Sequence, residues 1–358
     1  MKKILFSAYS LDVGGIETAL VTLLKYLVKE YEITLVLEKK QGIFLKDLPK
    51  EIKIITYSPS TIKFMPIRKV INLFKQLKFK IRYKNKFDFA ADFATYSMPA
   101  SFTARVASKN NAIWIHNNYM NFYDDDIIKY RKFFKSLKIE NFKKIVFVSD
   151  LDKKVFIAQF PELTKNTVVC NNLIDFEKIQ KLSNEEIEEK RESIPTFINV
   201  GRHDEKQKKI SRIIDATEKL NKQGYKFKVI LVGKGTATKQ YEQVIKEKGL
   251  DNIKMLGAKK NPYPYFKISD AFLLSSQFEG YPVVFVESQI LGLPIITTDV
   301  SDSKKDIQGK YGLVVENSEK GVYKGMKEFL DKGIKTLKFD PEKFNEDIIE
   351  KIRSIIND

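Results

Sequence analysis

Short apolar runs alternate along the chain with segments in which apolar residues recur at helical spacing. In the first half, the runs that predict strands cover residues 3–8, 32–38, 52–57, 88–93, 112–116 and 144–149. In the second half, they cover 196–201, 226–232, 252–256, 270–276, 293–298 and 312–315. Such alternation is typical of a doubly wound parallel sheet, and it occurs twice. The predicted fold class is therefore α/β.

A polar stretch separates the two halves. Residues 171–193 include the acidic segment 183–190, which contrasts with the apolar strands on either side. A chain of 358 residues also exceeds what one hydrophobic core usually supports. We therefore predict two Rossmann-like domains, 1–175 and 176–338, that face one another across a cleft, where ligands are often bound. An amphipathic helix is expected within 339–358.

The most distinctive chemistry follows the predicted strand 270–276. The segment Phe278–Glu287 has the sequence FEGYPVVFVE and leads into an apolar helix. A loop between a strand and a helix is where open α/β sheets place their ligands. Gly280 allows the backbone to approach a ligand, and Pro282 suits the first helical position, where no N–H is needed. The free amides of that helix would point at an anion.

Glu287 is unusual because the helix around it is apolar on nearly all sides. An ionised carboxylate in such surroundings is costly unless it is partnered. Hydroxyl groups of a bound sugar or ribose would be suitable partners. The alternative interpretation places Glu287 on a thin polar edge of the helix and Glu279 in a solvated loop.

Two turns of the first half carry polar groups at predicted strand ends. The segment Asp12–Glu17 contains Gly14 and Gly15 and precedes a predicted helix, so it could receive an anion or a sugar hydroxyl. It is not the three-glycine dinucleotide fingerprint, and alone it is a weak signal. His116 ends the strand 112–116 and precedes Asn117. Both a structural role and an active-site role remain open for this histidine.

A cationic loop follows the first predicted strand of the second half. Arg202 comes directly after Gly201, and Lys206, Lys208 and Lys209 follow closely. Arginine offers a bidentate fork to a phosphate, and lysine offers a point charge. The alternative is an ordinary basic surface loop.

Overall charge and cysteine content narrow the function classes. The net charge of +17 predicts acidic partners, which could be nucleic acid, an anionic membrane or a phosphorylated substrate. Cys170 is the single cysteine, which excludes an internal disulfide, fits a reducing compartment, and is expected to be a small buried hydrophobe. No run of about 18 apolar residues occurs, so no segment is expected to span a membrane. We expect a cytoplasmic protein.

Two basic segments suggest peripheral attachment to the inner face of the cell membrane. Residues 63–86 contain nine Lys and Arg, no acid, and interleaved apolar residues. Residues 129–144 contain seven more, together with Phe133, Phe134 and Leu137. Residues 63–86 could form a surface helix with an ordinary core stripe or an amphipathic helix on an anionic membrane, and the presence of two such basic segments makes membrane docking the preferred interpretation. The residues expected to contact the membrane are Lys63, Arg68, Lys69, Phe74, Lys75, Lys78, Lys80 and Arg82. Because no nucleic-acid-binding motif occurs, no nucleic acid partner is expected.

The second half resembles glycosyltransferase family 4, whose members are retaining enzymes of the GT-B fold. The resemblance is carried by Arg202, by Gly233 and Gly235, and by Glu279 and Glu287 with seven residues between them. It covers almost the whole chain and is looser in the first half. There, Gly14, Gly15 and Glu17 match the family's first turn, and His116 matches a histidine that lines the cleft. The family lysine is matched by Lys208 in helix register or by Lys206 in a Glu-Lys pair, and we favour Lys208.

The resemblance implies a hexosyltransferase that moves a sugar from a UDP- or GDP-sugar with retention at the anomeric carbon. It implies that Arg202 and Lys208 hold the diphosphate, that Glu287 holds the ribose, and that Glu279 orients the donor sugar. The implied catalytic residues are His116, Arg202, Lys208 and Glu279. The implied donor-binding residues are Gly14, Gly15, Gly201, Arg202, Lys208, Gly233, Gly257, Glu279, Gly280, Tyr281, Pro282, Val283 and Glu287. The implied acceptor-binding residues are Gly14, Gly15, Glu17 and Asn117.

No cofactor or metal is expected, because fixed cations and helix amides would neutralise the leaving diphosphate. By the same resemblance, the C-terminal helix is expected to pack back on the first domain. Three hypotheses remain open. The first is a transferase that extends a lipid-linked glycan for a capsule or exopolysaccharide. The second is a GT-B enzyme with a soluble acceptor, or a nucleotide-sugar epimerase. The third is a non-enzymatic basic scaffold that binds lipid or nucleic acid.

Overall fold

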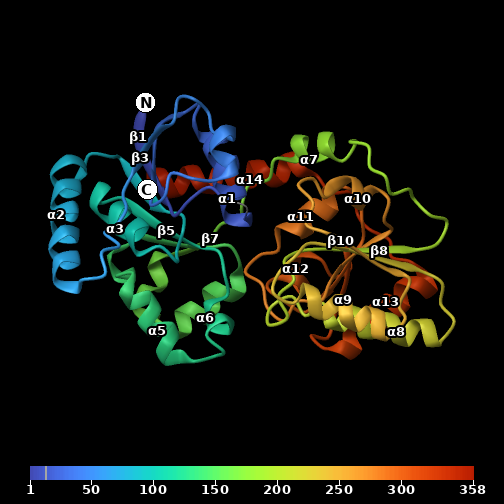
Figure 1. Ribbon diagram of the computed structural model, residues 1–358. Helices are drawn as coiled ribbons and strands as arrows, with labels where there is room; N and C mark the ends of the chain where they lie inside the picture. The colour runs from blue at the N-terminus through green and yellow to red at the C-terminus, as the bar shows by residue number, and fades with distance from the viewer. Residues whose placement is uncertain (13) are drawn as a thin grey trace. The chain divides into compact units, whose positions relative to one another are not determined.

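The computed structural model describes residues 1–12 and 14–358, so Val13 of the glycine-rich turn lies outside the described residues. The chain divides into two compact units. The first comprises Met1–Ile174 with Lys343–Asp358, and the second comprises Asp175–Glu342. Figure 1 shows the elements of both units, and each unit is described by itself below.

The first unit is built on a parallel sheet of seven strands. Its strand order is β3 (Lys53–Thr56), β2 (Tyr31–Leu37), β1 (Lys2–Ala8), β4 (Phe89–Asp92), β5 (Asn111–Ile115), β6 (Lys144–Phe147) and β7 (Thr167–Val169). Its helices are α1 (Gly15–Leu27), α2 (Met65–Tyr83), α3 (Met98–Ala107), α4 (Tyr119–Phe122), α5 (Ile127–Ser136), α6 (Asp150–Gln159) and most of α14 (Pro341–Asn357). Short 3-10 helices cover Ile43–Asp47, Ile139–Asn141 and Pro161–Asn166.

The second unit is built on a parallel sheet of six strands. Its strand order is β10 (Ile253–Gly257), β9 (Lys228–Val232), β8 (Thr196–Val200), β11 (Ala271–Leu274), β12 (Ile295–Thr298) and β13 (Gly312–Val315). Its helices are α7 (Phe176–Leu182), α8 (Ser211–Lys222), α9 (Thr238–Glu247), α10 (Tyr263–Lys267), α11 (Val283–Ile290), α12 (Ser303–Asp306) and α13 (Glu319–Lys332). The predicted α/β class and parallel sheets are confirmed.

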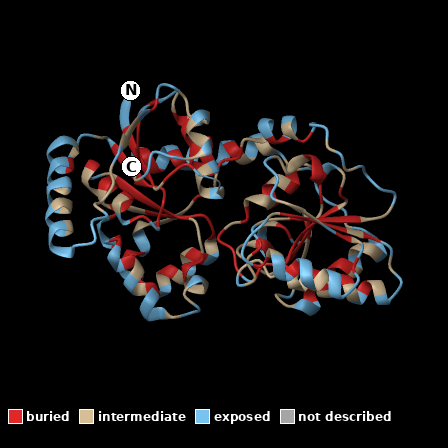
Figure 2. Ribbon diagram, viewed as in Figure 1, coloured by how far each residue is buried: buried red, intermediate tan, exposed pale blue. Residues whose placement is uncertain are grey.

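Helices cover both faces of each sheet, which is why the strands are continuous apolar runs rather than alternating ones. In the first unit, α1 and α14 pack on one face, and α5 and α6 pack on the other. In the second, α8, α9 and α13 cover one face, and α10 and α11 cover the other. The central strands are accordingly mostly buried in Figure 2, whereas the edge strands β3, β7, β10 and β13 are only partly buried.

The C-terminal helix α14 packs on the first sheet, as predicted. Five isoleucines of α14 join the core that contains β1 and α1. The Arg353 guanidinium also donates to both carboxylate oxygens of Glu30, at 3.1 and 2.6 Å. The end of the chain is thereby fixed to the beginning of the same unit. Cys170 is fully buried in this core, as expected.

The prediction that residues 129–144 lie on a membrane is wrong for their apolar side chains. Phe134 and Leu137 are buried, and Phe133 packs against the same core. The three side chains therefore form the core-facing stripe of α5 and its C-terminal turn. Asp126 is the N-cap of α5, because its carboxylate accepts a hydrogen bond from the Lys129 amide at 3.0 Å.

Candidate functional site

The predicted donor-binding residues of the second unit lie mainly in loops at the carboxyl edge of its sheet. Strand β8 ends at Val200, and Gly201 and Arg202 follow it. Strand β11, its parallel neighbour, ends at Leu274 and leads through Glu279 to α11. Because adjacent parallel strands end at the same edge, the two loops meet there.

Lys208 and Glu279 form an ion pair at this edge. The Lys208 Nζ lies 2.6 Å from the Glu279 Oε1, and the Glu279 side chain is only 8% exposed. Ser276 Oγ donates to the same oxygen at 2.6 Å, and Gln207 Nε2 contacts Oε2 at 3.4 Å. The alternative interpretation of Glu279 as a solvated loop residue is therefore wrong. A buried carboxylate of this kind requires its cation and its hydrogen bonds.

Arg202 is the exposed cation beside this pair. Its Nη2 donates to the Gln207 Oε1 at 3.1 Å, so Gln207 links Arg202 to Glu279. Within the described ranges, no carboxylate pairs with the guanidinium. The charge of Arg202 is therefore not neutralised inside the protein, whereas that of Lys208 is balanced by Glu279.

The two candidate lysines differ in position. Lys208 reaches the Glu279 loop, and its side chain also lies over Gly201, where an added Cβ would be 3.8 Å from the Lys208 Cε. Lys206 is exposed at the outside of the same loop. The geometry thus places Lys208, the favoured residue, next to Arg202 and Glu279.

Gly233 and Gly235 let the loop after β9 pack on the loop after β8. Gly233 has a φ of +148°, and an added Cβ would lie 1.8 Å from the Gly201 carbonyl oxygen. At Gly235, a Cβ would lie 2.3 Å from the His203 carbonyl oxygen. The Gly233 amide also donates to the Gly257 carbonyl at 2.9 Å. These contacts bring the backbones at Gly201, Gly233 and Gly257 together. A side chain at Gly233 or Gly235 would collide with the neighbouring backbone, so close packing accounts for glycine at both positions.

The start of α11 differs from the prediction by one position. The helix begins at Val283, and Pro282 is its N-cap with extended backbone rather than its first helical residue. The Phe285 amide donates to the Pro282 carbonyl at 3.0 Å, so the amides of Val283 and Val284 precede the first helical bond. The Gly280 carbonyl accepts a hydrogen bond from Ser301, and Tyr281 is half-buried.

Glu287 is partnered within the protein by a residue that the sequence did not indicate. The Tyr263 hydroxyl of α10 donates to the Glu287 Oε1 at 3.0 Å. Burial raises the pKa of Glu287 to about 7, and the hydrogen bond from Tyr263 partly opposes this shift. The second carboxylate oxygen has no hydrogen-bond partner among residues 1–12 and 14–358. A ligand hydroxyl could therefore donate to it.

The raised pKa of Glu287 predicts a stability gain from Glu287→Gln in the ligand-free protein. Because the folded-state pKa exceeds the unfolded value of about 4.5, this carboxyl favours folding at low pH and loses that contribution as the pH rises through 7. The free energy of unfolding of the variant should therefore exceed that of the wild type by about 1–3 kcal/mol at pH 8, and by less at pH 5.5. Urea denaturation at the two pH values measures this difference.

The control for this prediction is Glu328→Gln, on the exposed surface of α13. Its side chain stays in water, so the difference between variant and wild type should be nearly the same at both pH values. A pH-independent effect of Glu287→Gln would contradict the assignment of a strained, ionisable carboxylate at this position.

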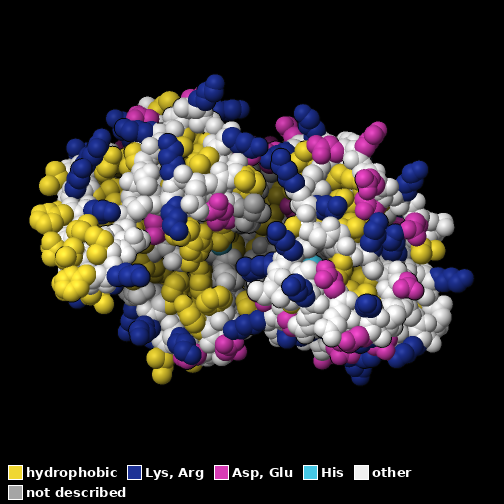
Figure 3. Space-filling model, viewed as in Figure 1, with side chains coloured by type: hydrophobic (Ala, Val, Ile, Leu, Met, Phe, Trp, Pro, Cys, Tyr) yellow, Lys and Arg dark blue, Asp and Glu magenta, His cyan; other side chains and the backbone are white. Residues whose placement is uncertain are grey.

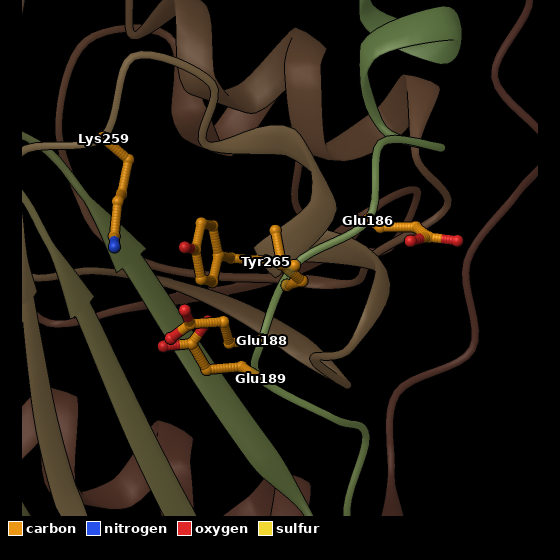
Figure 4. Close-up of a pocket in the computed structure, with 6 residues that line it drawn as sticks. Glu186, Glu188, Glu189, Lys259 and Tyr265 are labelled. Atoms are coloured by element: carbon orange, nitrogen blue, oxygen red, sulfur yellow. The ribbon is translucent and has the colours of Figure 1, made fainter.

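A separate acidic cavity of about 550 Å³ occurs in the second unit (Figure 4). It is lined by Glu186, Glu188 and Glu189 of the polar stretch and by Lys259 and Tyr265. The Lys259 Nζ lies 5.5 Å from the centre of the Tyr265 ring, and Glu186 points away from the other labelled side chains in Figure 4. Its lining carboxylates outnumber its one lysine, which disfavours a phosphate-bearing ligand, so this cavity is not a candidate for the donor.

The predicted residues of the first unit lie at the carboxyl edge of its own sheet. Gly14 precedes α1 and is covered by Glu17, because an added Cβ would lie 2.1 Å from the Glu17 Oε2. The Glu17 Oε1 accepts a hydrogen bond from Tyr96 at 3.1 Å. Burial raises the pKa of Glu17, and hydrogen bonds from its backbone and from Tyr96 oppose the shift. Gly15 has no atom near its added Cβ.

His116 follows β5 and packs on Phe93, with ring centres 4.5 Å apart. Burial lowers the pKa of His116 to about 3, so the imidazole is neutral at pH 7. Neither ring nitrogen has a side-chain hydrogen-bond partner within the described part of the chain. The half-buried Asn117 follows it directly. A neutral imidazole has one donor and one acceptor nitrogen, so His116 can donate to or accept from a substrate hydroxyl.

Sequence reasoning missed Gln207, Ser276 and Tyr263. Gln207 and Ser276 hold the Glu279 carboxylate, and Tyr263 holds that of Glu287. The requirement that a buried carboxylate be partnered predicts such groups but does not identify them. Among the described residues, no cluster of three metal-ligating side chains occurs. None of the described helices is long and apolar enough to cross a membrane.

Comparisons with known proteins bear on this geometry. The family model described as glycosyl transferases group 1 matches residues 180–358. A Campylobacter jejuni relative is 27% identical over 344 residues, which cover 92% of this chain and 91% of that protein. Its name is N-acetylgalactosamine-N,N'-diacetylbacillosaminyl-diphospho-undecaprenol 4-alpha-N-acetylgalactosaminyltransferase. An uncharacterized glycosyltransferase of Methanocaldococcus jannaschii is 28% identical over 230 residues, and the match spans 57% of this chain and 55% of that relative.

Solved structures show the same fold. Anabaena HepE in complex with UDP and glucose has a TM-score of 0.78 and 18% identity, over 99% of this chain and 100% of that one. Staphylococcus aureus TarM in complex with UDP has a TM-score of 0.74 and 14% identity, over 100% of both chains. At such identity the likeness shows the fold alone, which is GT-B.

Proposed function

Because the chain belongs to the glycosyl transferases group 1 family, we propose that it transfers a sugar from a UDP- or GDP-sugar to a lipid-linked glycan. The transfer proceeds with retention at the anomeric carbon, does not depend on a metal, and serves the synthesis of a surface polysaccharide. The observation that carries this proposal is the exposed Arg202 guanidinium, which has no carboxylate partner among the described residues. It lies beside Lys208, at the sheet edge from which the loop to α11 departs.

The leaving nucleoside diphosphate accumulates negative charge as the bond to the sugar breaks. Arg202 supplies a fixed cation with two parallel donors, and the amides of Val283 and Val284 at the start of α11 supply dipoles. Groups that are already oriented stabilise this charge without reorganisation, which is the requirement for lowering the barrier. In this scheme Lys208, held by Glu279, contributes a second cation whose position is set in advance.

Glu279 and Glu287 have positioning roles in this proposal. Glu279 orients Lys208 and accepts hydrogen bonds from donor-sugar hydroxyls. The free oxygen of Glu287 accepts a hydrogen bond from a ribose hydroxyl. His116, neutral at pH 7 because of its lowered pKa, lines the face on which the acceptor hydroxyl attacks. Gly14, Gly15, Glu17 and Asn117 bind the acceptor.

The relatives and structural neighbours support a nucleotide-sugar as the donor and a lipid-linked glycan as the acceptor. HepE and TarM have been crystallised with UDP. The name of the Campylobacter relative specifies an acceptor on diphospho-undecaprenol. A Staphylococcus aureus relative, 28% identical over 203 residues, is a capsular polysaccharide biosynthesis glycosyltransferase. A lipid-linked acceptor would bring the enzyme to the membrane.

Helix α2 supports that location. Phe79 is its only buried residue, while Phe74 is 67% exposed and Ile81 is 81% exposed. The helix contains basic residues and no acid. Figure 3 shows the exposed apolar side chains gathered over α2 at the left of the molecule, with Lys and Arg beside them. An exposed apolar patch of this kind marks an interaction surface. We place the anionic membrane at this surface.

A panel of nucleotide-sugars tests the proposal. A donor that binds only the folded protein raises its stability by about 2.7 kcal/mol at a hundredfold excess over Kd. We expect a UDP- or GDP-sugar to raise the melting temperature in the presence of EDTA, and Arg202→Ala to abolish the shift. If no nucleotide-sugar shifts the melting temperature, or if the shift requires Mg²⁺ or Mn²⁺, the proposed donor site is wrong.

A further inference from the structure

A second cavity, of about 700 Å³, lies in the first unit at the carboxyl ends of β1, β2 and β3. Tyr9, Glu38 and Tyr57 follow these three strands and line it together with Asn72 and Gln76 of α2. None of these residues belongs to the predicted acceptor-binding set. Residues around the start of α3, including Tyr96, complete the wall.

Glu38 and Asn72 each use one polar atom in a hydrogen bond within the protein and keep another polar atom available for a ligand. Glu38 Oε2 accepts a hydrogen bond from Ser97 Oγ at 2.8 Å, and that hydroxyl also caps α3 by accepting from the Ala100 amide at 3.2 Å. Glu38 Oε1 has no hydrogen-bond partner among residues 1–12 and 14–358. Asn72 Oδ1 accepts from the Ser60 amide at 2.6 Å, which leaves its N–H donors available.

Aromatic side chains form the remainder of the wall. The Tyr57 ring stacks on Phe102 with centres 5.5 Å apart, and Tyr9 meets Tyr96 edge to face at 6.1 Å. Rigid ring faces bind the apolar C–H face of a pyranose, while amides and a carboxylate bind its hydroxyls. Such a combination of apolar walls and a few fixed polar groups is typical of a small-molecule site.

The charge of the cavity is opposite to that of the protein. Glu38 is its only charged lining residue, although the chain carries a net charge of +17. The adjoining cavity, which shares Tyr57, is lined by Lys75, Lys78 and Arg82 and by no acid. Lys39, whose Nζ lies 5.0 Å from the centre of the Tyr9 ring, is a cation beside this wall and reduces the repulsion by Glu38 in part. An anionic ligand group is therefore favoured in the neighbouring cavity, with its three cations, over the cavity of Glu38.

We propose that the Glu38 cavity binds an uncharged sugar unit of the acceptor glycan and that Glu38 excludes units that carry a carboxylate or phosphate. This inference rests on the proposed function for the identity of the ligand as an acceptor. The selectivity for neutral sugars can be measured as a binding affinity, without a nucleotide and without sugar transfer.

Saturation-transfer NMR and calorimetry on the full chain, without nucleotide-sugar, test the selectivity. The probes are methyl glycosides of glucose, galactose, N-acetylglucosamine and N-acetylgalactosamine, compared with methyl glucuronide and methyl galacturonide. At least one neutral glycoside should bind in the millimolar range. The matching uronide should bind about fivefold more weakly, as expected for one unit charge near another in a hydrated site.

Two variants and two controls make the test specific. Glu38→Gln retains an acceptor for Ser97 and should remove the discrimination against uronides. Gln76→Ala should weaken binding of the neutral glycoside severalfold. Glu51→Gln makes the same charge change at an exposed position of the same unit and should alter neither affinity. Arg202→Ala should also leave saccharide binding unchanged, which separates this site from the donor site.

The outcomes are decisive in both directions. Absence of binding by every neutral glycoside, or equal affinity for the matching uronide, would overturn the proposal. Glycoside binding that survives both Glu38→Gln and Gln76→Ala unaltered would place it elsewhere. A protein that binds neutral glycosides selectively but shows no thermal shift with any nucleotide-sugar would retain this site and lose the proposed function.

Discussion

Replacing Arg202 by alanine is expected to lower the rate at which UDP or GDP is released from the nucleotide-sugar by about 10²–10³-fold. Removing one preorganised donor from a developing anion typically has an effect of this size. The loss should appear in kcat as well as in KM, because the charge on the diphosphate is greatest in the transition state. Arg202→Lys should recover only part of the rate, since lysine keeps the charge but lacks the bidentate fork. Steady-state kinetics of the three proteins measure the difference.

Stability separates the role of Arg202 from that of Lys208. The Arg202 guanidinium is exposed and, among the described residues, is hydrogen-bonded only to the neutral Gln207, so Arg202→Ala should leave urea stability nearly unchanged. Lys208→Ala removes the cation from the buried Glu279 and should cost about 3–5 kcal/mol in addition to activity. Lys239→Ala, on the exposed surface of α9, is the control for loss of a cation. Full activity of Arg202→Ala would sink the proposed mechanism.

The strands and their order of appearance could be predicted because a buried parallel strand leaves a plain signal. Each is a short apolar run between helical segments, and the boundaries differ by only a few residues from those observed. Strand β7 is the exception. It has three residues, Thr167–Val169, all half-buried at the sheet edge, which is too short a run to stand out.

The residues of the candidate site could be proposed from the sequence, but the side-chain pairs that they form could not. A carboxylate in apolar sequence must find a partner, and this rule singled out Glu287. It could not name Tyr263, which lies 24 residues away on another helix. Likewise, Lys208 and Glu279 are 71 residues apart and meet only because β8 and β11 are neighbours in the sheet. Sequence patterns give local geometry, whereas these partners depend on strand order.

The two basic amphipathic segments, 63–86 and 129–144, have similar patterns but different environments. This difference also depends on tertiary packing, which a local sequence pattern does not specify. In α5, Tyr130 and Phe134 are buried in the core of the first unit. In α2, Phe79 is buried and Ile71 and Tyr83 are partly buried, but the other large apolar side chains, including Phe74 and Ile81, are exposed. An apolar stripe at helical spacing indicates that something covers the helix, but not whether it is protein or lipid. Only the packing distinguishes them.

That difference leads to the second large expected effect, which concerns binding to anionic vesicles. A variant with Lys69, Lys75, Lys78 and Lys80 changed to glutamine loses four charges from α2. Each cation near an anionic surface contributes about 1 kcal/mol, so affinity for phosphatidylglycerol-containing vesicles should fall by about 10³-fold. Flotation of the full chain with such vesicles measures the bound fraction. Phosphatidylcholine vesicles should bind the wild type weakly.

A matched control separates the position of the charges from their number. Changing Lys239, Lys246, Lys320 and Lys324 to glutamine removes four exposed charges from α9 and α13 of the second unit and gives the same net charge. This protein should float with the vesicles almost as the wild type does. Equal losses in both variants would show a general attraction of a basic protein, and no dedicated surface.

The apolar side chains of α2 provide the final discrimination. Phe74 and Ile81 are 67% and 81% exposed, so their replacement by serine removes no contact that the folded protein needs. Burying such side chains in the membrane contributes about 1.5–3 kcal/mol each, and this part of the affinity is not screened by salt. Wild-type binding should therefore persist in part at high salt, while binding of Phe74→Ser/Ile81→Ser should be lost there. If both proteins release from vesicles at the same salt concentration, α2 lies on the surface through its charges alone, and its exposed apolar side chains require a protein partner instead.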